Sequence, residues 1–133
     1  MSRKSQPGEW NKLSAQLVHE EYCYLTTTGR VTGKPHKIEI WFGLKDKVVY
    51  LLSGGRDKSD WVKNLMKNPS VTLRIGRHTF QAAARIVTDE KEETVARYLL
   101  AEKYQEWEKE RELSEWARTS LPVAMDLAPE GTP

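Results

Sequence analysis

The feature that most constrains the fold is the short connection between successive strand-like segments. Residues 21–28, 36–44 and 48–53 are rich in aromatic and β-branched side chains, and they are separated only by 29–35 and 45–47. Parallel neighbours need a crossover of about a dozen residues or more, usually a helix. These three strands must therefore run antiparallel, which excludes a parallel Rossmann sheet.

The pattern within these segments predicts how each strand is buried. Residues 36–44 place Ile38, Ile40 and Phe42 on one face and polar residues on the other, as in a half-buried strand. Residues 48–53 (VVYLLS) are apolar on both faces and should be central. Further short strands are expected at 70–75, 79–87 and 122–127.

Helical patterns flank these strands. An amphipathic helix is expected over 9–20, a second over 61–68, and a long third helix from Asp89, as its cap, to about Glu112. A short turn capped by Ser114 follows. We therefore expect one domain over residues 1–133, a six-stranded antiparallel barrel with flanking helices, because closure removes sheet edges. The ends, 1–8 and 128–133, are expected to be mobile.

Composition excludes several classes of protein. The 21 Lys and Arg residues against 19 Asp and Glu residues give a net charge of +2, which argues against nucleic-acid binding by bulk charge. The single cysteine, Cys23, excludes a disulfide framework and fits a reducing cytosol. The three histidines are scattered, so no metal site is expected. No apolar run is long enough for a membrane span, and no secretory signal is visible.

Positive charge is concentrated in two glycine-containing loops. The cations are Arg30, Lys34, His36 and Lys37 in and after the first loop, and Arg56 and Lys58 in the second. The first loop does not match a phosphate-binding P-loop, because its spacing is wrong and a strand follows it. If 36–44 pairs with 48–53, both loops lie at one end of the barrel. We therefore expect an anionic ligand group, phosphate or carboxylate, to bind there.

Little in the sequence indicates a protein nucleophile. Cys23 lies within a strand and reads as a small buried hydrophobe. Trp41 and Trp61 lie near the two loops and could stack on a flat ring, although core or interface packing is an equal interpretation. Any demanding chemistry would therefore come from a bound cofactor.

Two motifs indicate a resemblance to a known family. The runs YLTTTGRVTGKPHKIEIWF and DWVKNLMKNPSVTLRIG, with VVYLLSGG between them, resemble the deazaflavin-dependent nitroreductase family. The similarity covers roughly 22–87 and extends weakly to the closing SEWARTSLPVAMDL. It implies a flavin split barrel, similar to pyridoxamine phosphate oxidases. It also implies coenzyme F420, a 5-deazaflavin with a phosphate and an oligoglutamate tail.

The resemblance also implies roles for particular residues. Arg30, Thr32 and Gly33 match the loop that binds the tail, with Lys34 and His36 at its flank. Val31 stands where the family often has a cation, and Lys37 or Arg56 would compensate. Residues near the deazaflavin ring would be Trp41, Ser53, Gly54, Gly55 and Trp61.

The expected function is hydride transfer from reduced F420 to a quinone, enone or nitro compound in the cytoplasm. Tyr104 is our candidate proton donor, with solvent as the alternative. An FMN-dependent oxidoreductase would suit the same loops. A non-catalytic module that binds a cofactor or single-stranded nucleic acid is the alternative from another class. A homodimer paired through the sheet is also expected.

Overall fold

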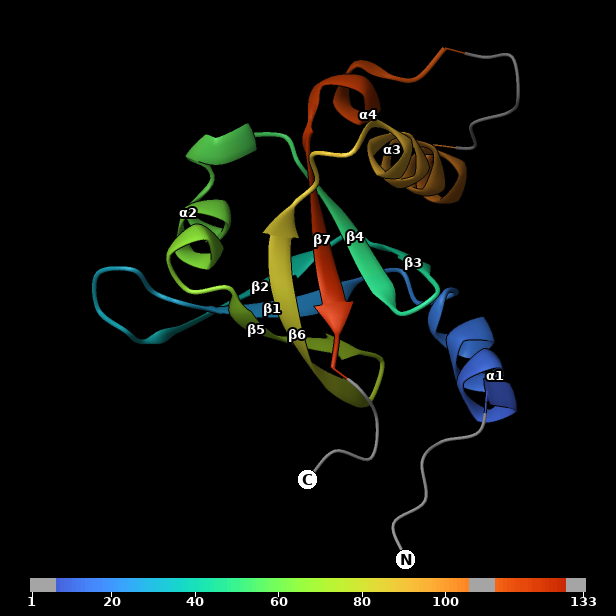
Figure 1. The fold of residues 1–133 in the computed structure, drawn as a ribbon, viewed down its shortest axis with the longest axis horizontal. Helices are drawn as coiled ribbons and strands as arrows, with labels where there is room; N and C mark the ends of the chain where they lie inside the picture. Colours follow the sequence, from blue (N-terminus) through green and yellow to red (C-terminus); the bar gives the residue numbers. More distant parts are fainter. Residues whose placement is uncertain (1–6, 106–111, 129–133) are drawn as a thin grey trace, which may run out of the picture.

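The computed structural model describes residues 7–105 and 112–128, which form one antiparallel sheet and its flanking helices (Figure 1). The strand order is β2-β1-β5-β6-β7-β4-β3. The strands are β1 (Cys23–Thr28), β2 (Pro35–Ile40), β3 (Gly43–Lys45), β4 (Val48–Ser53), β5 (Ser70–Ile75), β6 (His78–Ile86) and β7 (Leu121–Leu127). The helices are α1 (Pro7–Leu17), the 3₁₀ turn η1 (Arg56–Lys58), α2 (Asp60–Lys67), α3 (Glu90–Tyr104) and α4 (Glu115–Thr119).

The two edge strands, β2 and β3, are consecutive in the chain, and only Trp41 and Phe42 separate them. A sheet whose opposite edges are joined by two residues must curl, so the result is a split, half-closed barrel. The β2 strand pairs with β1, whereas β3 pairs with β4. The prediction of a single strand over 36–44 is therefore wrong in one respect, because the segment changes partner in the middle. The sheet of the described residues has seven strands, not the six expected.

The physical reason for this break lies in the backbone of Phe42. Its N–H donates to the Tyr104 hydroxyl at 2.9 Å, and its carbonyl accepts from the same hydroxyl at 2.9 Å. The Lys103 ammonium also donates to that carbonyl at 3.2 Å. Side chains of α3 thus replace the ladder hydrogen bonds of Phe42, and its ring is fully buried. The alternation of side chains along a strand does not reveal that side chains from a distant helix replace its backbone hydrogen bonds.

Apolar residues form two clusters on the two sides of β4. The larger cluster fills the curled sheet and includes Leu51, with Trp10 of α1 and Leu65 of α2 packed against the barrel. The smaller cluster joins the other face of β4, at Tyr50, to α3, at Leu100. The expectation that 48–53 is buried on both faces is therefore confirmed.

The helix caps follow the sequence signals. The Asp89 carboxylate accepts from the N–H of Glu92, and the Ser114 hydroxyl accepts from the N–H of Ala117. The α3 helix ends at Tyr104, earlier than expected, and the remainder of the expected helix, 106–111, lies outside the described residues. Most of the two ends that were expected to be mobile, 1–8 and 128–133, also lies outside the described residues. No helix in the described ranges is long and apolar enough to cross a membrane.

Candidate functional site

The loop between β1 and β2, residues 29–34, has a backbone geometry that requires its glycines. The N–H of Gly29 donates to the carbonyl of Lys34 at 2.8 Å, and the N–H of Gly33 donates to the carbonyl of Gly29 at 2.9 Å. Gly33 has a φ of +74°, in the left-handed region. A Cβ at Gly29 would lie 2.6 Å from the His36 imidazole. The glycines therefore allow a tight loop with His36 folded against it.

Arg30 is held by the first turns of α2. Its backbone N–H and its Nη1 both donate to the Asn64 Oδ1, at 3.1 and 2.9 Å. Its Nη1 also donates to the Asp60 carbonyl at 3.4 Å, and its Nη2 pairs with the Asp60 carboxylate at 3.1 Å. The buried Asn64 amide donates in turn to the Thr27 hydroxyl at 3.2 Å. The position of this loop is thus fixed from β1 and from α2.

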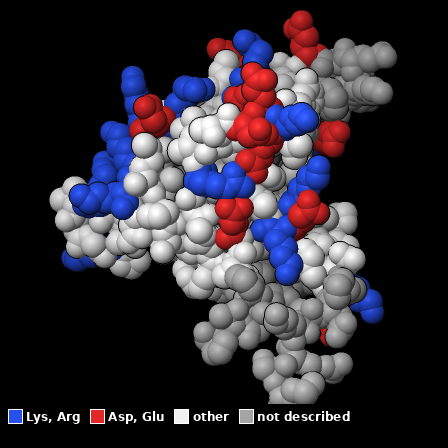
Figure 2. Space-filling view, in the orientation of Figure 1, with Lys and Arg blue, Asp and Glu red and all other residues white. Residues whose placement is uncertain are grey.

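Two open pockets lie against this loop. One, of about 220 Å³, is lined by Arg30, Val31, Thr32, His36, Asp60 and Asn64. The other, of about 470 Å³, is lined by residues 28–33 with Lys67 and Asn68. Figure 2 shows Lys and Arg side chains gathered on the side where Figure 1 places α2 and the β1–β2 loop. Lys34 is exposed on the same loop. An anion is the ligand that this combination favours.

The second cation-bearing loop, residues 54–59, is built on the buried Ser53. The Ser53 hydroxyl donates to the Arg56 carbonyl at 2.8 Å and lies 2.8 Å from the Ser59 hydroxyl. A Cβ at Gly55 would come within 2.6 Å of that Ser59 hydroxyl. The exposed Arg56 guanidinium donates to the carbonyl of Thr119, at the end of α4. Arg56 is therefore tied to the α4 side of the loop.

The two loops are linked through α2, and not by the strand pairing inferred from the sequence. The start of β2 pairs with the end of β1, and the end of β4 pairs with β7. The expected pairing of 36–44 with 48–53 holds only for the β3 part. Instead, α2 follows the second loop directly and presents Asp60 and Asn64 to Arg30 of the first.

An aromatic pocket of about 290 Å³ lies beyond the other end of β2. It is lined by Tyr22, Glu39, Ile40, Trp41, Leu52 and Trp116. The Trp41 ring stacks on Tyr104 with 4.5 Å between centroids, and the Trp116 ring meets it edge-on at 5.5 Å. A Cβ built on Gly54 would lie 3.6 Å from Trp116, so the second loop borders this pocket. Flat aromatic walls favour a planar ligand.

Tyr104 lies behind Trp41, and its hydroxyl contacts the backbone. Besides its two bonds with Phe42, this hydroxyl lies 2.8 Å from the carbonyl of Glu21. Burial raises its pKa to about 12. These contacts give Tyr104 a structural function, and its role as a proton donor stays a prediction.

Two other residues expected at the site lie elsewhere. The Lys37 ammonium lies 5.6 Å from the centroid of the Tyr24 ring, on the face of β2 opposite to His36. Trp61 is partly buried and packs against the large core cluster. Neither residue lines the loop pockets or the aromatic pocket described above.

Sequence reasoning missed four residues that shape these pockets: Tyr22, Asp60, Asn64 and Trp116. Asn64 sits between Val62 and Leu65, which are buried, so a polar residue beside an apolar helix face was a usable signal. Trp116 had no such signal, because its position depends on how α4 packs. In the described ranges, no group of His, Cys, Asp and Glu residues could hold a metal ion.

The residues present fit a cofactor that has a flat ring and an anionic tail. His36 lines the loop pocket and Ile40 lines the aromatic pocket, so β2 connects the two over about 13 Å. The first pocket offers guanidinium and imidazole groups, whereas the second offers indole and phenol rings. The donor chemistry therefore changes from ionic to aromatic along a single strand.

Comparisons with known proteins find one family model and several solved structures that this chain resembles. A family model described as F420H(2)-dependent quinone reductase matches residues 4–127. A structure of an F420-H2 dependent reductase is 20% identical, with a TM-score of 0.60 over 79% of this chain and 93% of that one. A FAD-binding protein from Mesorhizobium loti is 14% identical, with a TM-score of 0.63 over 95% and 92%. A structure described as a domain-swapped dimer is 20% identical, with a TM-score of 0.59 over 92% and 100%. These similarities support a split-barrel fold.

Proposed function

Because the chain belongs to the F420H2-dependent quinone reductase family, we propose that it transfers a hydride from reduced coenzyme F420 to a small organic acceptor. The acceptor classes that we propose are quinones, enones and nitro compounds. The observation that supports this most is the change from an ionic to an aromatic pocket along β2.

In this proposal the chain holds the two ends of the coenzyme by different chemistry. Arg30, Lys34 and His36 hold the phosphate and glutamate tail, with Thr32 and Gly33 shaping the loop. Ser53, Gly54 and Gly55 border the deazaflavin, and Trp41 with Trp116 provides aromatic walls. The coenzyme, when bound, supplies the hydride, and the protein supplies orientation and electrostatics.

The aromatic pocket is where we propose that the acceptor enters. Planar acceptors such as quinones match walls made by Tyr22, Trp41 and Trp116. The proton that accompanies the hydride would come from solvent or from a phenol. Tyr104 is the phenol that we proposed from the sequence, and Tyr22 is the one that lines the pocket.

The first experiment is a titration of the purified protein with F420 and, separately, with FMN, followed by ligand fluorescence. Tight binding of the deazaflavin alone is the expected result. Tight binding of FMN alone would move the protein to the FMN-dependent alternative with the same fold. Binding of neither would contradict the proposed function and revive a non-catalytic binding module.

Activity is then measured as oxidation of reduced F420 with a quinone, an enone and a nitro compound as acceptors. We expect at least one of these classes to support turnover. A cytoplasmic location and a homodimer remain parts of the proposal, and sedimentation of the purified protein tests the dimer.

A further inference from the structure

We propose that Asn64 and Asp60 act in opposite directions on Arg30, Asn64 as a residue that positions it for an anionic ligand and Asp60 as an internal competitor for it. This inference rests on the proposed function, because the anion is taken to be the phosphate or a carboxylate of the coenzyme tail. Neither residue needs to contact the ligand for the inference to hold.

The positioning part rests on the Asn64 side chain, which is 3% exposed and has partners on both atoms of its amide. Its oxygen accepts from the backbone and from the guanidinium of Arg30. Its nitrogen donates to Thr27, which fixes which way the amide points. One buried side chain therefore sets both where the loop starts and where the Arg30 side chain lies.

The competing part rests on the Asp60 carboxylate. This carboxylate accepts from the Arg30 Nη2 at 3.1 Å, while its side chain is 86% exposed. The Arg30 side chain is 33% exposed and lines the loop pocket. An exposed ion pair is weak, so an incoming anion can exchange with it. A carboxylate or phosphate binds the same guanidinium N–H groups that Asp60 now occupies.

These two contacts predict variants with opposite effects on the affinity for F420. Asp60→Asn removes the competing charge and should tighten binding about two- to fivefold. Asn64→Ala removes the amide oxygen that accepts from the Arg30 guanidinium, and it should weaken binding about tenfold or more. In an Arg30→Ala background, Asp60→Asn should change the affinity no further. Asn64→Ala should keep only the part of its effect that acts through the backbone N–H at position 30.

The experiment measures dissociation constants by fluorescence for F420 and for the deazaflavin chromophore without phosphate and glutamates. Both effects should appear with F420 and be absent with the tail-less chromophore. Asp57→Asn is the matched control, because it removes the same charge from the neighbouring exposed turn, and it should change the affinity for F420 less than Asp60→Asn does. An equal gain in Asp57→Asn, or no gain in Asp60→Asn, would overturn the competition.

Thermal unfolding of each variant separates positioning from folding. If Asn64→Ala does not fold, Thr27→Val replaces it, because it removes only the group that orients the amide, and about threefold weaker F420 binding is expected. Equal losses for F420 and the tail-less chromophore would contradict the positioning role. If the wild-type protein binds F420 and these variants do not differ from it, only this inference fails. If the wild type binds neither deazaflavin, the proposed function fails.

Discussion

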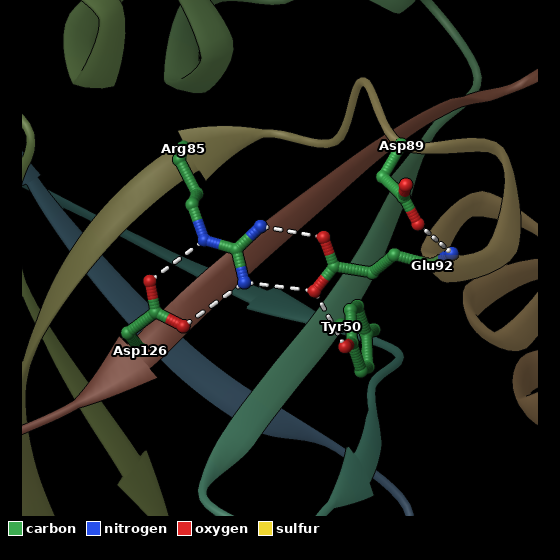
Figure 3. Close-up of polar contacts among 5 residues, drawn as sticks. All are labelled: Tyr50, Arg85, Asp89, Glu92 and Asp126. Atoms are coloured by element: carbon green, nitrogen blue, oxygen red, sulfur yellow. Dashed lines mark hydrogen bonds and ion pairs between the residues drawn. The ribbon is translucent and has the colours of Figure 1, made fainter.

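Two arginines of this molecule make ion pairs of opposite character. Arg85 on β6 is paired with two carboxylates. Its guanidinium donates to both oxygens of Glu92, at 2.6 and 2.7 Å, and to both oxygens of Asp126, at 2.7 and 3.1 Å (Figure 3). Arg30 has one carboxylate, which is largely exposed, and one buried amide. The first guanidinium is saturated by the protein, whereas the second can exchange its carboxylate for a ligand.

The surroundings of the two arginines sharpen this difference. Tyr50 donates to Glu92 at 2.8 Å, so the Arg85 network joins β4, β6, β7 and α3. Hydrogen bonds from Arg85 and Tyr50 lower the pKa of Glu92. The network around Arg30 joins only the β1–β2 loop to α2 and borders open pockets. Strong pairing thus marks a structural contact here, and incomplete pairing marks a candidate site.

The largest expected effect is on ligand affinity at the incomplete pair. Arg30→Ala should weaken F420 binding about ten- to a hundredfold, because a charge-assisted contact worth about 1.5–3 kcal/mol is lost. The dissociation constant from the fluorescence titration measures this. Arg85→Ala is the control, and it should bind F420 as the wild type does. Unchanged affinity in Arg30→Ala would show that the tail assignment is wrong.

A second prediction tests whether the contact of Tyr104 with Phe42 stabilises the fold or whether Tyr104 acts in proton transfer. Tyr104→Phe removes the hydroxyl partner of the Phe42 N–H, and an unsatisfied buried donor costs about 1–3 kcal/mol. Denaturant unfolding should show a loss of stability within that range. A large loss of kcat at unchanged stability would instead assign Tyr104 a role in proton transfer.

A third prediction concerns the saturated arginine itself. Arg85→Met should lower the free energy of unfolding by about 1 kcal/mol, since its pairs are partly exposed and surface pairs are individually weak. The urea midpoint measures this loss at pH 7. At acidic pH the difference from the wild type should shrink, because Glu92 loses its charge as the pH falls through its lowered pKa. A loss of F420 affinity in this variant would break the contrast between the two arginines.

The smallest expected effect comes from Lys103, whose burial lowers its pKa from 10.5 to about 8. Above pH 8 the unfolded chain holds more protons than the folded one at this residue, so stability should rise with pH. Between pH 8 and 9 the free energy of unfolding should rise by less than about 1.4 kcal/mol, which is the limit for one proton over one pH unit. Above pH 9 the rise is opposed, because burial raises the pKa of Cys23 to about 12. Urea unfolding at both pH values, with Lys103→Met as the variant that should lose the rise, checks this.

The sequence predicted the antiparallel class and most strand positions, because side-chain alternation reflects burial directly. It did not predict the break at Phe42, since the groups that replace the ladder there come from Lys103 and Tyr104, about sixty residues away. The role of the loop cations in binding an anion stays a prediction. Their partners, Asp60 and Asn64, could not be assigned without the packing of α2.

The order of the strands has a consequence for how the chain acquires its sheet. β7, the last strand of the described residues, lies between β6 and β4, and it pairs with both. Until that strand arrives, two inner strands expose unpaired edges, and one of them, β4, is apolar on both faces. Synthesis from the N-terminus therefore leaves the sheet open in its middle until β7 has been made. During that interval the gap would accept the equivalent strand of another nascent chain, so slow release of β7 favours strand exchange between molecules.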